Sequence, residues 1–200
     1  MSSQFVRRPQ NLKLPDSDIH YYPNFFDHEE ADYFLRLFKT TILWQQDSIK
    51  VFGKVYPQPR LTALYGDNDK TYTYSNITMQ PRNFTPELKV LKERIENLCE
   101  TQFTSCLLNL YRDGKDSNGW HADNEKELGI NPIIASVSLG QERYFNLKHR
   151  NRPELKHKIL LEHGSLLLMK GETQHSWLHQ IPKTSKSIGE RINLTFRKIK

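Results

Sequence analysis

The sequence predicts one domain of mainly β structure (α+β), a sandwich or jelly roll with helices near its N-terminus. Beyond Phe103 the chain consists of short strand-like segments separated by turn signals, which is typical of these folds rather than of alternating α/β units. Two hundred residues without a linker, an internal repeat or a low-complexity segment indicate a single domain with a sizeable core. The strands expected in this second half span residues 105–111, 133–139, 143–148, 157–161, 165–170, 174–180 and 191–198.

The composition favours an intracellular protein with a basic surface. Lys and Arg outnumber Asp and Glu by 29 to 23, and the resulting charge of +6 fits nucleic acid or another polyanion. Cys99 and Cys106 form no C-x-x-C pair and are expected to be buried and reduced. No apolar run has the length of a membrane span, and the chain starts with polar residues. We expect a monomer without a membrane partner, cytoplasmic in a bacterium or nuclear in a eukaryote.

The N-terminal region is expected to contain a loose arm, a strand and a helix. Residues 1–15 are polar and basic, which indicates a flexible arm, and residues 19–26 are rich in β-favouring aromatics. Asp27 has the features of an N-cap, and Glu29 and Glu30 follow in the first turn, where the helix dipole favours acids. The buried side of this helix is expected to contain Phe34, Leu35, Leu37 and Phe38.

A β-rich stretch, residues 44–63, is expected to contain a hairpin over residues 49–56 with Phe52 near its tip. A large apolar side chain near a turn between Lys50 and Lys54 has two interpretations. It folds back onto the body of the protein, or it acts as a wedge that enters a base stack while the lysines contact phosphates.

Two further elements precede the second half. Tyr72 and Tyr74 belong to an aromatic strand, where such residues serve either as core and cross-strand contacts or as platforms for bases. Thr85 followed by Pro86 is typical of a helix start. The buttressing helix that follows is expected to bury Leu88, Leu91, Ile95 and Leu98.

The pair His121 and Asp123 is the main candidate for chemistry. Residues two apart on a strand or strand end point to the same side, so both side chains could reach one metal ion, although a solvated turn gives the same spacing. Two later histidines, His175 and His179, share a face, and periodicity does not decide between them, whereas His163 resembles a turn residue. Two histidines and one carboxylate form the facial triad of non-haem Fe(II) oxygenases, but these ligands also suit Mn(II), Ni(II) or Zn(II).

The last strand carries a second candidate site. Arg191 and Arg197 face the same way, and Asn193 and Thr195 lie between them on that face. Either this face is exposed to solvent, or it binds a small dicarboxylate cosubstrate through a bidentate arginine. On the strand that leads to the metal motif, Asn109 and Tyr111 share a face and could add hydrogen bonds.

An ordered set of motifs resembles the AlkB family of Fe(II)/2-oxoglutarate dioxygenases, most closely the branch that contains the animal nuclear DNA-repair dealkylases. The resemblance covers roughly residues 20–199. It rests on Asn109-Leu110-Tyr111-Arg112-Asp113-Gly114, Gly119-Trp120-His121-Ala122-Asp123-Asn124-Glu125, Ile134-Ala135-Ser136-Val137-Ser138-Leu139-Gly140, His163-Gly164-Ser165-Leu166-Leu167, Trp177-Leu178-His179 and Arg191-Ile192-Asn193-Leu194-Thr195-Phe196-Arg197. It continues N-terminally through Val51-Phe52-Gly53-Lys54, Pro59-Arg60, Tyr65-Gly66-Asp67 and Tyr72-Thr73-Tyr74-Ser75.

The resemblance implies a role for each matching residue. The iron ligands, and thus the catalytic residues, would be His121, Asp123 and His179. The 2-oxoglutarate site would comprise Asn109, Tyr111, Arg191, Asn193, Thr195 and Arg197. The substrate site would comprise Phe52 as a finger in the duplex, Arg60, Tyr72, Tyr74 stacked on a flipped base, and Glu125 near its exocyclic amino group. Two departures, Asn124 in place of an aspartate and Tyr74 in place of a phenylalanine, concern substrate preference only.

The implied fold is a double-stranded β-helix (jelly roll) over residues 104–200, with N-terminal helices and a hairpin nucleotide-recognition lid over residues 16–103. The implied reaction removes alkyl groups from bases such as 1-methyladenine and 3-methylcytosine in DNA. It uses Fe(II), O2 and 2-oxoglutarate, and releases formaldehyde, succinate and CO2. The alternatives are an RNA demethylase, a 2-oxoglutarate-dependent hydroxylase with a protein or lipid substrate, and a jelly roll that only binds nucleic acid.

Overall fold

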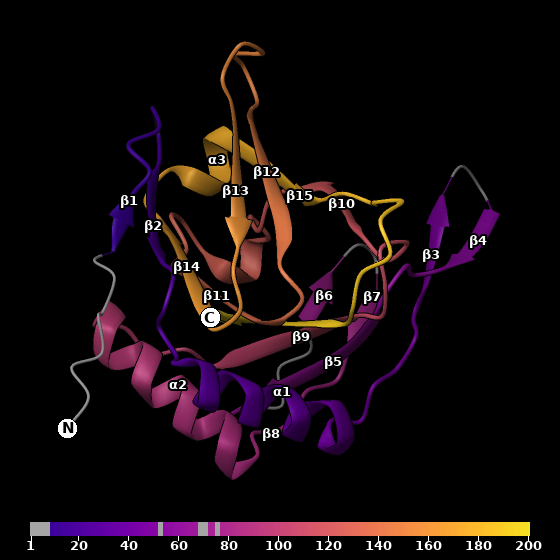
Figure 1. Ribbon diagram of the computed structural model, residues 1–200. Coiled ribbons are helices and arrows are strands. Elements are labelled where there is room, and N and C mark those ends of the chain that lie inside the picture. The colour runs from indigo at the N-terminus through magenta and orange to yellow at the C-terminus, as the bar shows by residue number, and fades with distance from the viewer. Residues whose placement is uncertain (1–8, 52–53, 68–71, 75–76) are drawn as a thin grey trace.

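The computed structural model describes residues 9–51, 54–67, 72–74 and 77–200, without the side chains of residues 50–51, 72–74 and 77–78 (Figure 1). Two β-sheets face each other, and two helices cover the far side of the larger one. The large sheet contains, in spatial order, β1 (Gln10–Asn11), β2 (Asp18–Tyr22), β14 (Ser165–Lys170), β11 (Ile134–Gly140), β16 (Arg191–Arg197), β9 (Ser105–Tyr111), β5 (Leu61–Gly66) and β8 (Arg82–Asn83). The small sheet contains β10 (Asn118–His121), β15 (Trp177–Ile181), β12 (Arg143–His149) and β13 (Lys156–Leu161).

This arrangement is the expected double-stranded β-helix. Every strand pair in the two sheets is antiparallel except β5 with β8. Alternation along each strand therefore sends side chains either into the space between the sheets or towards the helices. On β16, Ile192, Leu194 and Phe196 pack towards the helices, which leaves the polar residues of that strand between the sheets.

The two helices begin at the predicted caps. Asp27 and Glu30 form a capping box at the start of α1 (His28–Thr41), because the Asp27 side chain accepts from Glu30 N–H and the Glu30 side chain accepts from Asp27 N–H. Thr85 Oγ1 accepts from Leu88 N–H at the start of α2 (Pro86–Cys99). The apolar cluster between the helices and the large sheet includes Phe34, Phe38, Leu88, Leu91, Ile95, Leu108, Leu194 and Phe196.

The prediction that Leu98 of α2 is buried is wrong. Leu98 is 39% exposed, whereas Cys99 packs against the helix-side core. At about 100° per residue, Cys99 lies within about 20° of Leu88 on the helix surface, but Leu98 lies about 80° away. The buried stripe therefore runs through Leu88, Leu91, Ile95 and Cys99.

The N-terminal half contributes strands to the large sheet. The strand expected over residues 19–26 is β2, which ends at Tyr22, ahead of the capping box of α1. Within the arm expected over residues 1–15, Gln10 and Asn11 pair with β2, so the described part of the arm is attached to the sheet. The sequence predicted a lid before residue 104 and the jelly-roll core after it. In the structure, β2 and β5, which precede residue 104, pair with strands of the core.

The predicted hairpin consists of β3 (Ser48–Val51) and β4 (Lys54–Pro57), which project from the body (Figure 1). The aromatic strand is β6 (Tyr72–Tyr74), paired with β7 (Ile77–Met79). A 3-10 turn, η1 (Lys126–Leu128), follows β10. The strand expected over residues 174–180 is wrong at its start, because residues 173–176 form the short helix α3 (Thr173–Ser176) and β15 begins at Trp177. Among the helices described, none has the length and apolar content required to cross a membrane.

Candidate metal and cosubstrate site

A group of ligand-type side chains lies where the small sheet faces the large one. His121 ends β10 and pairs in register with His179 on β15, so both imidazoles project from the same side of the sheet. Their Nε2 atoms are 3.1 Å apart, and His121 Nε2 is 3.9 Å from Oδ1 of Asp123. One ligand atom from each residue lies within 4.8 Å of the other two, so the structure brings together the three residues expected from the motifs.

The protonation of this group suits a metal ion. His121 Nδ1 lies 2.8 Å from the carbonyl oxygen of Gly119, which fixes the proton on Nδ1 and leaves the lone pair on Nε2. Burial lowers the pKa of His121, and burial together with His121 lowers the pKa of His179 to about 3, so both rings are neutral near pH 7. Two nitrogens at about 2.1 Å from one ion and at a right angle lie about 3 Å apart, close to the observed separation.

Asp123 is held in place by two buried neighbours. Arg197 Nη2 lies 3.0 Å from Oδ1 of Asp123, and Gln174 Oε1 accepts the Asp123 backbone N–H over 2.9 Å. Burial acts to raise the pKa of Asp123, but the charge of Arg197 outweighs it, so the net pKa is lowered. The carboxylate is therefore ionised and oriented towards the histidines. Gln174 carried no signal in the sequence because its contact depends on the unexpected helix α3.

The structure separates the two histidines that periodicity left equivalent. His175 lies on α3 and is exposed, whereas His179 lies on β15 with an exposed fraction of 4%. The ring of Phe145 stacks on His179 with centroids 5.0 Å apart and fixes its orientation. Only His179 of the pair reaches His121 and Asp123.

Arg191 is a buried cation that has no carboxylate partner among the residues described. Its exposed fraction is 1%, and Nη2 donates a hydrogen bond to Ser138 Oγ over 2.9 Å. Its Nε and Nη1 make no hydrogen bond of good geometry within the described part of the chain. The guanidinium lies 5.2 Å from the ring centre of Tyr111, and burial lowers its pKa to about 10. A buried, partly unpaired guanidinium is costly unless a ligand completes its contacts, which fits a carboxylate-bearing cosubstrate.

The other polar residues on the floor of the site are hydrogen-bonded to one another. Asn193 Nδ2 donates to Ser136 Oγ over 2.8 Å, and Thr195 Oγ1 donates to Asn193 Oδ1 over 3.0 Å. Asn109 Oδ1 accepts from Arg60 Nε over 2.7 Å. Arg60 is 3% exposed and donates also to Ser117 O, so its guanidinium points into the cosubstrate region rather than to the surface.

A single cavity joins the two sets of residues. It lies between the sheets and is bounded by both the ligand group and the arginine-bearing face of β16. Its lining includes Asn109, His121, Asp123, His179, Arg191 and Arg197. The polar face of β16 is thus neither exposed nor part of a dry core, because the small sheet covers it and a cavity separates the two.

The expected substrate residues are only partly described. Glu125 follows the metal motif directly, is half-buried and precedes η1. Phe52 and the side chains of Tyr72 and Tyr74 lie outside the described residues.

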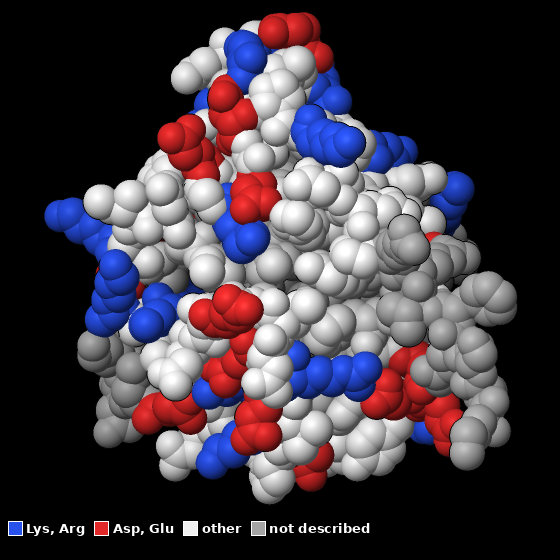
Figure 2. All heavy atoms as spheres, turned by 90° about the vertical axis from the view of Figure 1, so that its left-hand side faces the viewer, with Lys and Arg blue, Asp and Glu red and all other residues white. Residues whose placement is uncertain are grey.

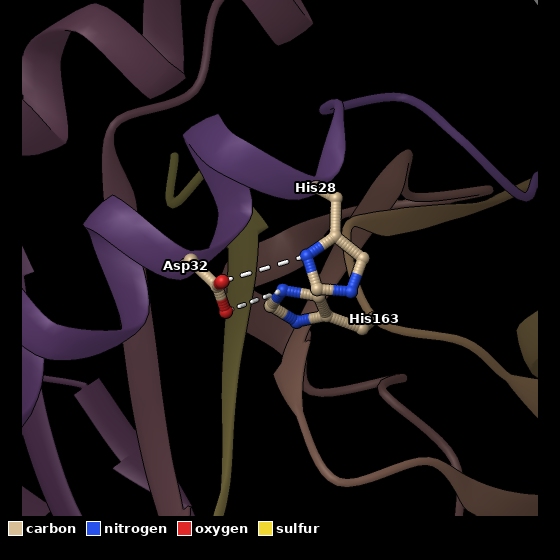
Figure 3. Close-up of side chains that lie close together, drawn as sticks. All are labelled: His28, Asp32 and His163. Carbon is tan, nitrogen blue, oxygen red and sulfur yellow. Dashed lines mark ion pairs between the residues drawn. The ribbon is translucent and has the colours of Figure 1, made fainter.

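A second group with the same residue types, His28, Asp32 and His163, lies where α1 meets the turn before β14 (Figure 3). Nδ1 of His28 is 3.4 Å from Oδ2 of Asp32, and Nε2 of His163 is 3.3 Å from Oδ1. Gly140 donates its N–H to Nδ1 of His163 over 2.7 Å. A neutral His163 therefore carries its proton on Nε2, next to Asp32, and offers no lone pair there to an ion. This group ties α1 to the turn rather than forming a metal site.

The match to a family model covers nearly the whole chain. Residues 18–197 match the model of the 2OG-Fe(II) oxygenase superfamily. The solved structure of OsALKBH1 has the same fold, with a TM-score of 0.70 over 96% of this chain and 100% of that one, at 18% identity.

Curated relatives are similar over most of this chain. The alpha-ketoglutarate-dependent dioxygenase alkB homolog 3 of Mus musculus is 44% identical over 187 residues, which are 89% of this chain and 65% of the relative. The DNA oxidative demethylase ALKBH2 of Homo sapiens is 39% identical over 158 residues, which are 76% of this chain and 60% of the relative. The chain therefore spans about two thirds or less of the length of these relatives.

Proposed function

We propose, from the premise that this chain belongs to the 2OG-Fe(II) oxygenase superfamily and within it to the AlkB family, that it removes N-alkyl groups from nucleic-acid bases by oxidation. The observation that carries this proposal is that one buried cavity contains both a set of metal-ligand side chains and a buried arginine. His121, Asp123 and His179 offer the ligands, and Arg191 offers a partly unpaired guanidinium on the opposite wall.

In this proposal His121, Asp123 and His179 hold Fe(II), and Arg191 holds a carboxylate of 2-oxoglutarate. Bound iron and 2-oxoglutarate supply the activation of O2 that hydroxylates an alkyl carbon. Arg197 keeps the Asp123 carboxylate ionised, Gln174 holds the Asp123 backbone N–H, and the Gly119 carbonyl keeps the His121 lone pair on Nε2. These contacts are present before any substrate binds, so the ligand side chains are preorganised.

Arg60, Asn109 and Tyr111 complete the cosubstrate wall. Arg60 holds Asn109 by a 2.7 Å hydrogen bond, and the Tyr111 ring supports the guanidinium of Arg191. Asn193 and Thr195 contribute hydrogen-bonding groups on the same strand face. A dicarboxylate would satisfy Nε and Nη1 of Arg191 with two charge-assisted hydrogen bonds.

For the substrate we propose DNA that contains 1-methyladenine or 3-methylcytosine. The name of a similar protein, DNA oxidative demethylase ALKBH2, and the net charge of +6 support a nucleic-acid substrate. Alkylation at these nitrogens blocks base pairing, which lowers the cost of flipping the base into a buried site. Hydroxylation of the methyl carbon gives a hemiaminal that releases formaldehyde, while 2-oxoglutarate becomes succinate and CO2. Glu125, Tyr72, Tyr74 and Phe52 are proposed to contact the base and the duplex.

The test is incubation of methylated DNA and RNA oligonucleotides with Fe(II) and 2-oxoglutarate, followed by mass spectrometry. We expect loss of one methylene mass from the DNA, with formaldehyde and succinate formed in equal amounts. Omission of 2-oxoglutarate and the Asp123→Ala variant are the controls and should show no loss. Turnover of 2-oxoglutarate without demethylation of any oligonucleotide would contradict a nucleic-acid substrate, and reaction with RNA alone would contradict DNA.

A further inference from the structure

The small sheet has two faces of opposite character. Its inner face carries His179 and Phe145 of the candidate site. Its outer face carries two exposed aromatic rings, Trp120 on β10 and Tyr144 on β12, which are 40% and 46% exposed. Because two exposed rings share this one face, it is a candidate for binding.

Each of these rings has a lysine over it. Lys148 Nζ lies 4.4 Å from the ring centre of Trp120, and Lys158 Nζ lies 3.6 Å from that of Tyr144. The placement follows from strand alternation and register. Tyr144 and Lys148 point outward because Arg143, Phe145, Leu147 and His149 point inward. Lys158 pairs with Asn146 and so lies diagonally to Tyr144 on the same face.

The charge of this outer face is almost entirely positive. A surface groove of about 520 Å³ lies beside Tyr144 and Lys158, and Lys183 and Lys186 line its other side. Glu142 is the one acidic residue in its lining among the residues described. The lysines of this face, Lys148, Lys156, Lys158, Lys183 and Lys186, form no ion pair with a carboxylate in the described ranges.

The side of the molecule shown in Figure 2 differs, because acidic and basic residues alternate on it. Elsewhere on the molecule, Lys170 pairs with Asp18 and Arg152 with Asp16. Positive charge that is compensated in this way does not attract a polyanion strongly. The uncompensated charge of the outer face of the small sheet does.

We infer that the outer face of the small sheet, defined by Trp120, Tyr144, Lys148, Lys156 and Lys158 with the groove lined by Lys183 and Lys186, binds the nucleic-acid strand that flanks the target base. This inference rests on the proposed function. Rings interleaved with lysines match a single strand, whose bases stack on aromatics and whose phosphates pair with ammonium groups. An exposed lysine–ring contact is weaker than base stacking, so a base displaces the lysine from the ring and the freed ammonium pairs with a phosphate.

The position of β10 connects this face to the candidate site. β10 is an edge strand of the small sheet, and Trp120 directly precedes His121. Trp120 is exposed, while His121 faces the cavity. A strand whose target base enters beside His121 therefore reaches the outer face by passing over this edge.

The test compares two double variants of equal charge change. Tyr144→Ala with Lys158→Ala removes an exposed ring and a lysine from the outer face. Tyr33→Ala with Lys89→Ala removes an exposed ring and an exposed lysine from the helical side. Fluorescence anisotropy with an unmethylated single-stranded oligonucleotide of about 20 nucleotides gives Kd at several salt concentrations. We expect Kd to rise about tenfold for the first variant and its log Kd–log salt slope to fall by about 0.7. Equal effects of both variants, or no effect of the first, would overturn the inference.

Two further arms separate this inference from the proposed function. A methylated trinucleotide is too short to cover both the cavity and the outer face, so the first variant should demethylate it at the wild-type rate but lose efficiency on the long oligonucleotide. If the wild type demethylates nothing, the proposed function fails. The anisotropy comparison then still shows whether the outer face binds a nucleic-acid strand. Polyglutamate is the control polyanion. Binding of polyglutamate with the same dependence on Tyr144 and Lys158 would overturn recognition of a nucleic-acid strand.

Discussion

The two groups of two histidines and one aspartate differ in what their hydrogen bonds leave available. In the first, the Gly119 carbonyl holds the Nδ1 proton of His121, so the Nε2 lone pair faces His179 and Asp123. In the second, the Gly140 N–H occupies Nδ1 of His163, so the remaining proton lies on Nε2 next to Asp32. A backbone carbonyl beside Nδ1 holds the proton there and leaves the lone pair on Nε2, where a metal ion could bind. A backbone N–H beside Nδ1 does the opposite, because it places the proton on Nε2.

Burial separates the two groups as well. The Asp123 side chain is 2% exposed and has Arg197 beside it, whereas Asp32 is 41% exposed and His28 is 83% exposed. A carboxylate in water is already well solvated, so its contacts with histidines contribute little. Residue types and proximity alone are therefore insufficient to identify a metal site, because tautomer and burial decide it.

The largest contrast is expected for the two aspartates. Asp123→Ala removes an ionised ligand and should lower kcat/KM of demethylation by more than about a hundredfold. Asp32→Ala should leave it within about twofold, because the contacts of that carboxylate among the described residues are to α1 and the His163 turn. The measurement is kcat/KM on one methylated oligonucleotide with saturating Fe(II). Similar losses in both variants would mean that the second group has been assigned wrongly.

Metal binding tests directly which of the two groups of two histidines and one aspartate holds an ion. Titration of the metal-free protein with Mn(II), followed by calorimetry, should show one equivalent bound per chain in the presence of 2-oxoglutarate. His179→Ala should weaken this binding by about a hundredfold, because one of three ligands is lost. His28→Ala is the matched control and should bind as the wild type does. A second equivalent that disappears in His28→Ala would contradict the tautomer argument.

The two buried arginines of β16 also differ from each other, in whether a carboxylate is paired with them. Within the described part of the chain Arg191 has no carboxylate partner, while Arg197 is paired with Asp123. Arg191→Met should raise KM for 2-oxoglutarate by about 10- to 100-fold, because two charge-assisted hydrogen bonds are lost. Its ligand-free form should unfold with an unchanged or larger free energy, since an uncompensated buried charge is removed.

Arg197→Met should instead lower the free energy of unfolding by about 3 kcal/mol, because it leaves the Asp123 carboxylate buried without its cation. Chemical denaturation of both ligand-free variants measures the two values. Equal destabilisation by the two substitutions would show that Arg191 has a partner in the protein.

The elements that depend on local sequence could be predicted, and those that depend on distant contacts could not. The bounds of β9 and β14 follow from short apolar runs between turn signals, and the cap at Asp27 follows from residues within one turn. Helix α3 was missed because distant contacts support it: Thr173 accepts from Asp18 N–H, and Gln174 reaches Asp123. The sequence favoured strand there, and tertiary structure overrode that preference.

The same distinction applies to the candidate site. The spacing of His121 and Asp123 indicated their proximity, since it requires only an extended backbone. Two features of these groups could not be predicted because they depend on residues far along the chain. The burial of Arg191 depends on the small sheet that covers β16, and the tautomer of His163 depends on Gly140, 23 residues away.

The smallest expected effect concerns the protonation of His163 and is measured through the pH dependence of stability. Burial and His28 keep the pKa of His163 below its ordinary value, although Asp32 acts in the opposite direction. The unfolded chain therefore binds more protons than the native one, so this contribution to stability is present above about pH 6.5 and is lost as the pH falls through the lower native pKa. His163→Asn keeps an acceptor for the Gly140 N–H but cannot be protonated. Its Tm should fall less between pH 7 and pH 5 than that of the wild type, by about 1–2 °C. His175→Asn, at an exposed position on α3, is the control and should follow the wild type; an unchanged pH slope in His163→Asn would show that His163 does not accept a proton on unfolding.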